Sequence, residues 1–125
     1  MRSPNREPQV RENIRTLDPA LCYLTSISLG EMVYGIERLP ASRRRRDLRS
    51  WLDQIEDAFT GRILPFDDEA ARIWGKLKAS GRTLPVEDAQ IASIAIRFDL
   101  RIATRNTQDF DGTGANLINP WKQAL

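Results

Sequence analysis

Apolar positions along the 125-residue chain fall into short runs separated by longer stretches of helical spacing. The short runs predict four buried strands, at about residues 21–25, 62–66, 100–104 and 116–118. Between the runs, apolar residues recur every three or four positions, which predicts helices at about 10–17, 28–39, 42–59, 67–80 and 85–98. Strands that alternate with helices predict an α/β fold, with a parallel sheet flanked by helices.

Individual residues predict several helix ends. Ser28 and Glu31 form a capping-box pattern, in which the serine begins the helix. Asp67 and Asp68 suit the positive end of the helix that follows them, so we assign both a structural role. Gly81 is predicted to end that helix.

Composition narrows the possible chemistry. The chain has no histidine and a single cysteine, Cys22. These counts exclude serine–histidine triads, thiol–histidine pairs and an intrachain disulfide, and they favour a reducing cytoplasm. No apolar stretch approaches the roughly 20 residues that span a bilayer, and the first residues contain no apolar signal region. We therefore expect one cytoplasmic domain, residues 1–125, without a membrane partner.

Positive charge is concentrated in one segment. The net charge is only +2, but four arginines are contiguous at 43–46, and Arg38 and Arg49 flank them. Such a patch suits RNA or an acidic protein surface. A solvated helix face is the alternative interpretation.

Asp88 is the most informative acidic position. Three apolar residues share its helix face: Ile91, Ala92 and Ala95. The opposite side is predicted to be polar: Gln90, Ser93 and Arg97. A carboxylate on a buried face needs a cation, hydrogen bonds or a proton. Both a metal-ligand role and bonding to amides at the helix N-terminus remain open.

Two further acidic residues are predicted near the same end of the sheet as Asp88. Glu31 lies off the apolar stripe of its helix, although it also fits a cap partner of Ser28. Asp109 follows the third strand, with Asn106 three residues before it, and turn chemistry is the alternative there. Ligands of α/β proteins bind beyond the carboxyl ends of the strands. Three converging carboxylates suit Mg²⁺ or Mn²⁺, which activates water against a phosphodiester.

Five segments resemble, in order and spacing, motifs of the VapC toxins in the PIN-domain family. They are TSISLGEMVYGIERLP (25–40), GRILPFDDEAA (61–71), LPVEDAQIASIA (84–95), LRIATRNTQDFDG (100–112) and LINPW (117–121). The resemblance covers nearly all of the chain. It implies a PIN-like fold and Mg²⁺- or Mn²⁺-dependent cleavage of RNA. It also implies a homodimer and a cognate VapB antitoxin whose C-terminal tail covers the active site.

The resemblance assigns roles to particular residues. Glu31 matches the glutamate of the family's L-x-E helix, and Asp88 matches the aspartate of its D-A-x-I-A helix. Asp109 matches the aspartate of the T-x-N-x-x-D-F loop, so all three are implied metal ligands. Asn106 and Thr104 match the asparagine and the small hydroxyl residue of that loop, which are implied members of the catalytic site.

One family feature has no counterpart in the chain. The family begins with an apolar strand ending in D-T-N, whose aspartate is a principal metal ligand, whereas MRSPNREPQV resembles the end of the first helix. We therefore expect an N-terminally truncated PIN-like domain with its first strand missing, and low stability or dimerisation as a consequence. The alternative function is a catalytically inactive remnant that dimerises or binds the antitoxin. A receiver-like phosphoacceptor is disfavoured, because Arg105 and not lysine follows the third strand.

Overall fold

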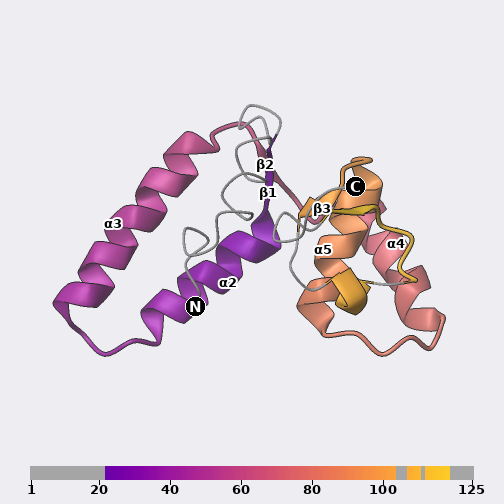
Figure 1. The fold of residues 1–125 in the computed structure, drawn as a ribbon, viewed down its shortest axis with the longest axis horizontal. Coiled ribbons are helices and arrows are strands. Elements are labelled where there is room, and N and C mark those ends of the chain that lie inside the picture. The colour runs from indigo at the N-terminus through magenta and orange to yellow at the C-terminus, as the bar shows by residue number, and fades with distance from the viewer. Residues whose placement is uncertain (1–21, 104–106, 111, 119–125) are drawn as a thin grey trace. The chain divides into compact units, whose positions relative to one another are not determined.

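The computed structural model describes residues 22–103, 107–110 and 112–118. Most of these residues form two compact units (Figure 1). The hairpin unit is Tyr23–Phe66, and the α4–α5 unit contains the described residues from Asp67 onward. The helix predicted at 10–17 lies outside the described residues. None of the helices in this described part is long and apolar enough to cross a membrane.

The hairpin unit combines two helices with a pair of short strands. β1 (Leu24–Thr25) runs directly into α2 (Ser26–Glu37), and α3 (Arg43–Ala58) then leads to β2 (Ile63–Leu64). The strands pair in parallel, with Leu24 opposite Ile63 and Thr25 opposite Leu64. α2 and α3 run in opposite directions on either side of a turn (Figure 1).

Two arginines hold the turn between α2 and α3. Arg49 donates to both carboxylate oxygens of Glu37, at 2.5 and 2.6 Å. Arg45 donates to the Leu39 carbonyl at 3.0 Å, and so satisfies an acceptor just beyond the end of α2. These contacts span 12 and 6 residues and fix the end of the hairpin.

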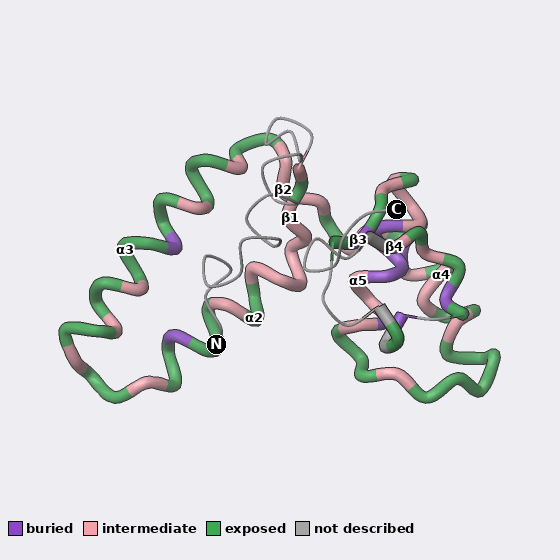
Figure 2. The backbone as a smooth tube through the Cα atoms, viewed as in Figure 1, coloured by how far each residue is buried: buried purple, intermediate pink, exposed green. Residues whose placement is uncertain are grey.

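The α4–α5 unit contains the larger core. α4 (Asp68–Ala79) packs against α5 (Val86–Arg97), which is followed by β3 (Ile102–Ala103), the 3₁₀ helix η3 (Thr107–Phe110) and β4 (Leu117–Ile118). β3 and β4 pair in parallel. Buried positions gather along α5 (Figure 2). The central apolar cluster comprises Ala92, Ala95, Ile102 and Phe110.

α5 ends in a Schellman motif that turns the chain toward β3. Asp99 has a φ of 55°, in the left-handed region that favours glycine. Its N–H donates to the Ile96 carbonyl at 3.2 Å, and the Leu100 N–H donates to the Ala95 carbonyl at 2.9 Å. The reversal leaves only Leu100 and Arg101 between the turn and the first residue of β3.

The predicted α/β class, with parallel strands and four helices in this part of the chain, is confirmed. α3 and α4 begin where expected. Ser42 caps α3 by accepting a hydrogen bond from the Arg45 N–H at 3.2 Å, and Asp67 caps α4 by accepting one from the Ala70 N–H at 2.8 Å. All four strands are shorter than predicted, with two residues each.

Two local predictions were wrong. α2 begins at Ser26 and not at Ser28, because the Thr25 hydroxyl accepts a hydrogen bond from the Ser28 N–H at 3.0 Å and caps the helix directly from the strand. Ser93 was expected on a polar side of α5, but it is fully buried. Its hydroxyl donates to the Ala89 carbonyl at 2.7 Å, so the helix itself satisfies this buried polar group.

Candidate functional site

Glu31 lies in the second turn of α2 and is exposed. Because Thr25 caps the helix, the third helical position is Ser28, and α2 has no acidic residue in its first turn. The capping-box interpretation of Glu31 was therefore wrong. The Thr25 hydroxyl instead donates to the Ser28 hydroxyl at 3.0 Å, so the cap is complete without the glutamate.

Asp88 lies in the first turn of α5, beside the buried face of the helix. Pro85 is the N-cap residue and supplies no side-chain cap. The Asp88 side chain is half-buried, whereas Ala89 and Ala92 are buried and the neighbouring Glu87 is exposed. The helix therefore presents one acidic residue at the edge of the core and one to solvent, one position apart.

The loop after β3 is partly a 3₁₀ turn that packs on α5. The backbone of Asp109 belongs to η3, which contacts α5. Phe110 anchors this turn in the core, and the Thr113 hydroxyl donates to the Phe110 carbonyl at 2.6 Å. The helix of Asp88 and the turn of Asp109 are thus brought together in one unit. The Asp109 side chain, like Thr104 and Asn106, lies outside the described part of the chain.

The metal site of Glu31, Asp88 and Asp109 stays a prediction. Glu31 belongs to the hairpin unit and the other two residues belong to the α4–α5 unit. Among the side chains that the structure describes, no group of three acidic or other ligating residues is arranged to hold a metal ion. The three residues all offer carboxylate oxygens, the ligands that Mg²⁺ and Mn²⁺ prefer, so the donor set fits a hard cation.

A charged contact supports the helix that carries Asp88. Arg97, at the end of α5, donates from Nε to Asp67 Oδ2 at 3.1 Å, and Glu69 lies 3.4 Å from the same nitrogen. The hydrogen bond from the Ala70 N–H and the Arg97 guanidinium together hold the pKa of Asp67 below its usual value. Sequence reasoning gave Asp67 a structural role at the start of the helix, but it missed both its role as the N-cap residue and its partner thirty residues away.

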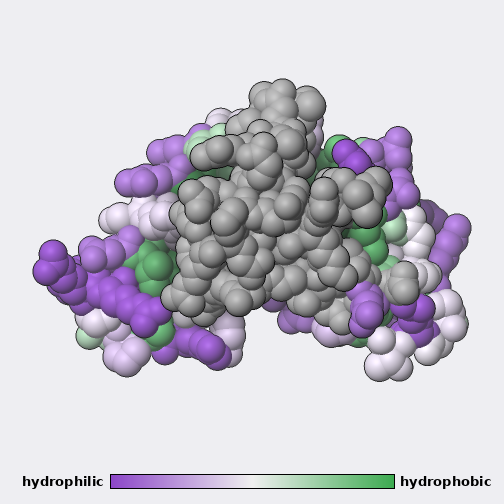
Figure 3. Space-filling view, in the orientation of Figure 1, coloured by the Kyte–Doolittle hydropathy of each residue, from purple (hydrophilic) through white to green (hydrophobic). Residues whose placement is uncertain are grey.

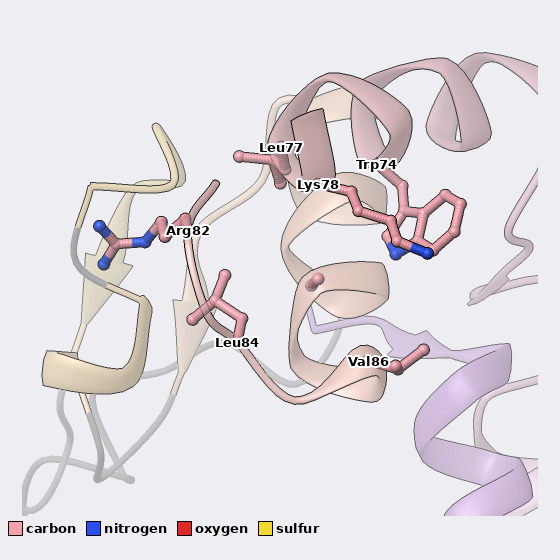
Figure 4. Close-up of a pocket in the computed structure, with 7 residues that line it drawn as sticks. Trp74, Leu77, Lys78, Arg82, Leu84 and Val86 are labelled. Atoms are coloured by element: carbon pink, nitrogen blue, oxygen red, sulfur yellow. The ribbon is translucent and has the colours of Figure 1, made fainter. Parts of the chain in front are cut away.

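A shallow groove lies between α4 and the chain entering α5 (Figure 4). Its lining is mainly apolar, with Lys78 and Arg82 as its only charged members: Trp74, Leu77, Lys78, Arg82, Leu84, Val86 and Ala89. The Lys78 ammonium lies 5.1 Å from the centre of the Trp74 ring. No carboxylate lines this groove, so it is not the predicted metal site.

The fold defines the class of protein. The crystal structure of FitAcB from Neisseria gonorrhoeae is similar to this chain with a TM-score of 0.82 and 31% identity, over 97% of this chain and 94% of that one. A family model described as PIN domain matches residues 2–115. The chain belongs to the PIN-domain family, and the resemblance to VapC toxins is confirmed by its relatives.

Two relatives show which members of the family this chain resembles in sequence. VapC ribonuclease Y4jK of Sinorhizobium fredii is 36% identical over 107 residues, which cover 82% of this chain and 76% of that protein. Toxin FitB of Neisseria gonorrhoeae is 34% identical over 104 residues, which cover 79% of this chain and 75% of that protein. The chain is therefore a PIN-domain protein of the VapC and FitB type.

Proposed function

We propose that this chain is an endoribonuclease toxin of a toxin–antitoxin pair, which cleaves RNA phosphodiester bonds with Mg²⁺ or Mn²⁺. The observation that carries the proposal is the PIN-domain match over residues 2–115, which spans all five predicted site positions. Two relatives, one named a VapC ribonuclease and the other a toxin, support the same function.

Glu31, Asp88 and Asp109 are the proposed metal ligands, and Asn106 and Thr104 are proposed to complete the catalytic site. The exposed position of Glu31 in the second turn of α2 and the half-buried position of Asp88 support this assignment. A divalent cation held by carboxylates supplies activated water and neutralises charge on the scissile phosphate. Glu31, Asp88 and Asp109 would hold the ion in their deprotonated form.

The proposed partners follow from the family. A cognate VapB-type antitoxin is expected to cover the active site with its C-terminal tail, and two copies of the chain are expected to form a homodimer. We expect the protein to act in the cytoplasm, where its proposed RNA substrate is found. A similar solved structure from Mycobacterium tuberculosis, described as a member of the VapBC family of toxin-antitoxin systems, supports an antitoxin partner.

The test is RNA cleavage by the purified 125-residue chain with Mg²⁺ or Mn²⁺. Asp88→Asn removes one charge without changing the side-chain shape, and we expect it to lower the rate by at least about 100-fold. Glu87→Gln is the matched control, because Glu87 is exposed in the same helical turn. Its rate is expected to stay within about twofold of the parent chain, as for surface substitutions generally.

EDTA is expected to abolish cleavage, and added Mn²⁺ or Mg²⁺ is expected to restore it. Equal loss in both variants would assign the activity to something other than the proposed site. A folded chain that cleaves no RNA with either ion, yet binds its antitoxin, would overturn the enzymatic proposal in favour of the inactive binding protein.

A further inference from the structure

The arginines at the end of the hairpin fall into two groups. Some bond to residues of the α2–α3 turn, and the others are exposed to solvent. Arg45 and Arg49 hold the turn through Leu39 and Glu37. Arg43 only approaches Asp47, at 4.0 Å, with both side chains largely exposed. Arg44 and Arg46 are exposed and have no ionic partner among the described residues. We call Arg43, Arg44 and Arg46 the arginine tip.

The segment around the arginine tip carries more positive charge than the rest of the protein. Residues 37–49 contain six arginines and two acidic residues, a net charge of +4, while the whole chain carries only +2. The remainder is therefore slightly negative. Hydrophilic residues gather at the free end of the hairpin, toward the left of the space-filling view (Figure 3). A concentrated positive field of this kind attracts a polyanion.

The outer face of α2 leads from the arginine tip to Glu31. Glu31, Tyr34 and Arg38 recur at i, i+3 and i+7, so they share one side of the helix, away from the buried Ile36. The Tyr34 side chain is 68% exposed, and the Arg38 guanidinium carbon lies 5.7 Å from its ring centre. From Glu31 to the end of α2 the rise is roughly 9 Å.

Next to Tyr34, the outer face of α2 has a glycine, Gly35, which leaves the helix backbone uncovered by a side chain. Gly35 is four residues after Glu31. Apart from its chain neighbours and the backbone of its own helix, no described atom lies within 4 Å of the position that a Cβ would occupy there. Glycine destabilises a helix interior relative to alanine, and no packing constraint in the described structure explains it. It leaves room for close approach of a ligand.

We infer that the outer face of α2 and the arginine tip form a track that binds single-stranded RNA. The inference rests on the proposed ribonuclease function and names the surface that holds its substrate. Arginines of the tip contact phosphates, and Tyr34 with Arg38 forms a platform for a stacked base. The exposed Tyr34 ring beside the Arg38 guanidinium favours RNA over an acidic protein segment, because such a segment offers no bases to stack.

The test measures RNA binding by the full chain carrying Asp88→Asn, so that substrate is not cleaved. The probe is a fluorescent single-stranded RNA of about 20 nucleotides, long enough for a binding site of this type. Arg43→Gln/Arg44→Gln/Arg46→Gln is compared with Arg72→Gln/Lys76→Gln/Arg101→Gln, which removes the same charge from three exposed positions outside the hairpin unit. Arg45 and Arg49 stay intact, so the hairpin keeps its holding contacts.

The arginine-tip variant is expected to bind at least about 20-fold more weakly at about 0.1 M salt, and its log–log salt slope should fall by about two. The control variant should keep the parent slope to within about half a unit. Tyr34→Ala is expected to weaken binding by about fivefold or more, and Tyr34→Phe should retain it, because the ring and not the hydroxyl stacks.

If the two triple variants lost RNA affinity equally, the proposed track would be overturned, because removal of positive charge anywhere on the protein would then weaken binding to the same extent. The track would also be overturned if the tip variant bound RNA normally and lost only a polyglutamate peptide, an outcome that would assign the surface to an acidic protein. A parent chain that binds RNA through the tip but never cleaves it would remove the proposed function and leave the track in place.

Discussion

At Asp67 a single carboxylate holds two helices. One oxygen accepts a hydrogen bond from the Ala70 N–H and begins α4, and the other accepts a hydrogen bond from Arg97 at the end of α5. Arg97 also stacks on Phe98, with 4.6 Å from its guanidinium carbon to the ring centre. This contact joins the start of α4 to the end of α5, the helix that carries Asp88.

Removal of the Asp67 side chain should therefore destabilise the α4–α5 unit. Asp67→Ala loses both contacts and is expected to lower Tm by several degrees. Asp67→Asn keeps the cap, because asparagine is as good an N-cap residue as aspartate, but it loses the charge that pairs with Arg97. Its Tm should lie between those of the parent and the alanine variant in a thermal melt at neutral pH. The control is Asp68→Ala, an exposed acidic residue of the same turn, and an equal decrease there would contradict the pairing.

The contribution of Asp67 should depend on pH in a defined direction. Its pKa is lowered in the folded chain, first by the hydrogen bond from the Ala70 N–H and then by Arg97. The stabilisation is therefore present above the unfolded pKa of about 3.9 and is lost as pH falls through the lower folded pKa. The Tm difference between the parent and Asp67→Asn should shrink below about pH 4 in melts at a series of pH values. If the Tm difference instead grew as the pH falls, the result would contradict a lowered pKa of Asp67 in the folded chain.

At the scale of elements, the helices could be predicted from sequence better than the strands. Apolar residues at helical spacing extend over 12 to 16 residues in α2 to α5, so the pattern is long enough to be distinctive. The strands have two residues each, and an apolar run cannot show which of its residues pair with a neighbour. Thr25 illustrates the limit, because it ends β1 and caps α2 at once.

The corner between α5 and β3 offers a direct test of element geometry. Asp99 occupies a left-handed conformation that glycine adopts without strain. Asp99→Gly is expected to stabilise the fold by about 0.5–1 kcal/mol, because relief of strain exceeds the greater flexibility of the unfolded glycine. Asp99→Ala should destabilise it, since alanine keeps the steric conflict and loses the local bonding available to aspartate. Chemical denaturation measures both, and a less stable glycine variant would show that the Asp99 side chain matters more than its backbone.

For the whole molecule, the sequence indicated candidate acidic positions, whose role as a site stays a prediction, but it did not indicate the contacts around them. The buried-face pattern and the family resemblance both indicated Asp88, and the resemblance indicated Glu31 against the local capping pattern. The contacts of Arg97 with Asp67, and of Arg49 with Glu37, depend on how helices pack, so no short motif contains both partners. Short sequence motifs can therefore indicate candidate site residues, whereas the contacts that support them become visible only in the three-dimensional structure.

Metal binding is the property that connects the proposed site to the stability of the molecule. A cation that binds the folded chain and not the unfolded chain raises the free energy of unfolding, by about 2.7 kcal/mol at 100 times its Kd. Mn²⁺ is therefore expected to raise Tm of the parent chain, and Glu31→Gln and Asp88→Asn should each abolish the increase, because each removes a proposed ligand. Glu87→Gln should keep it. Thermal melts with and without Mn²⁺ measure this increase in Tm. If the increase persisted in both ligand variants, the cation would bind at other residues, because a shared site that loses a carboxylate also loses affinity.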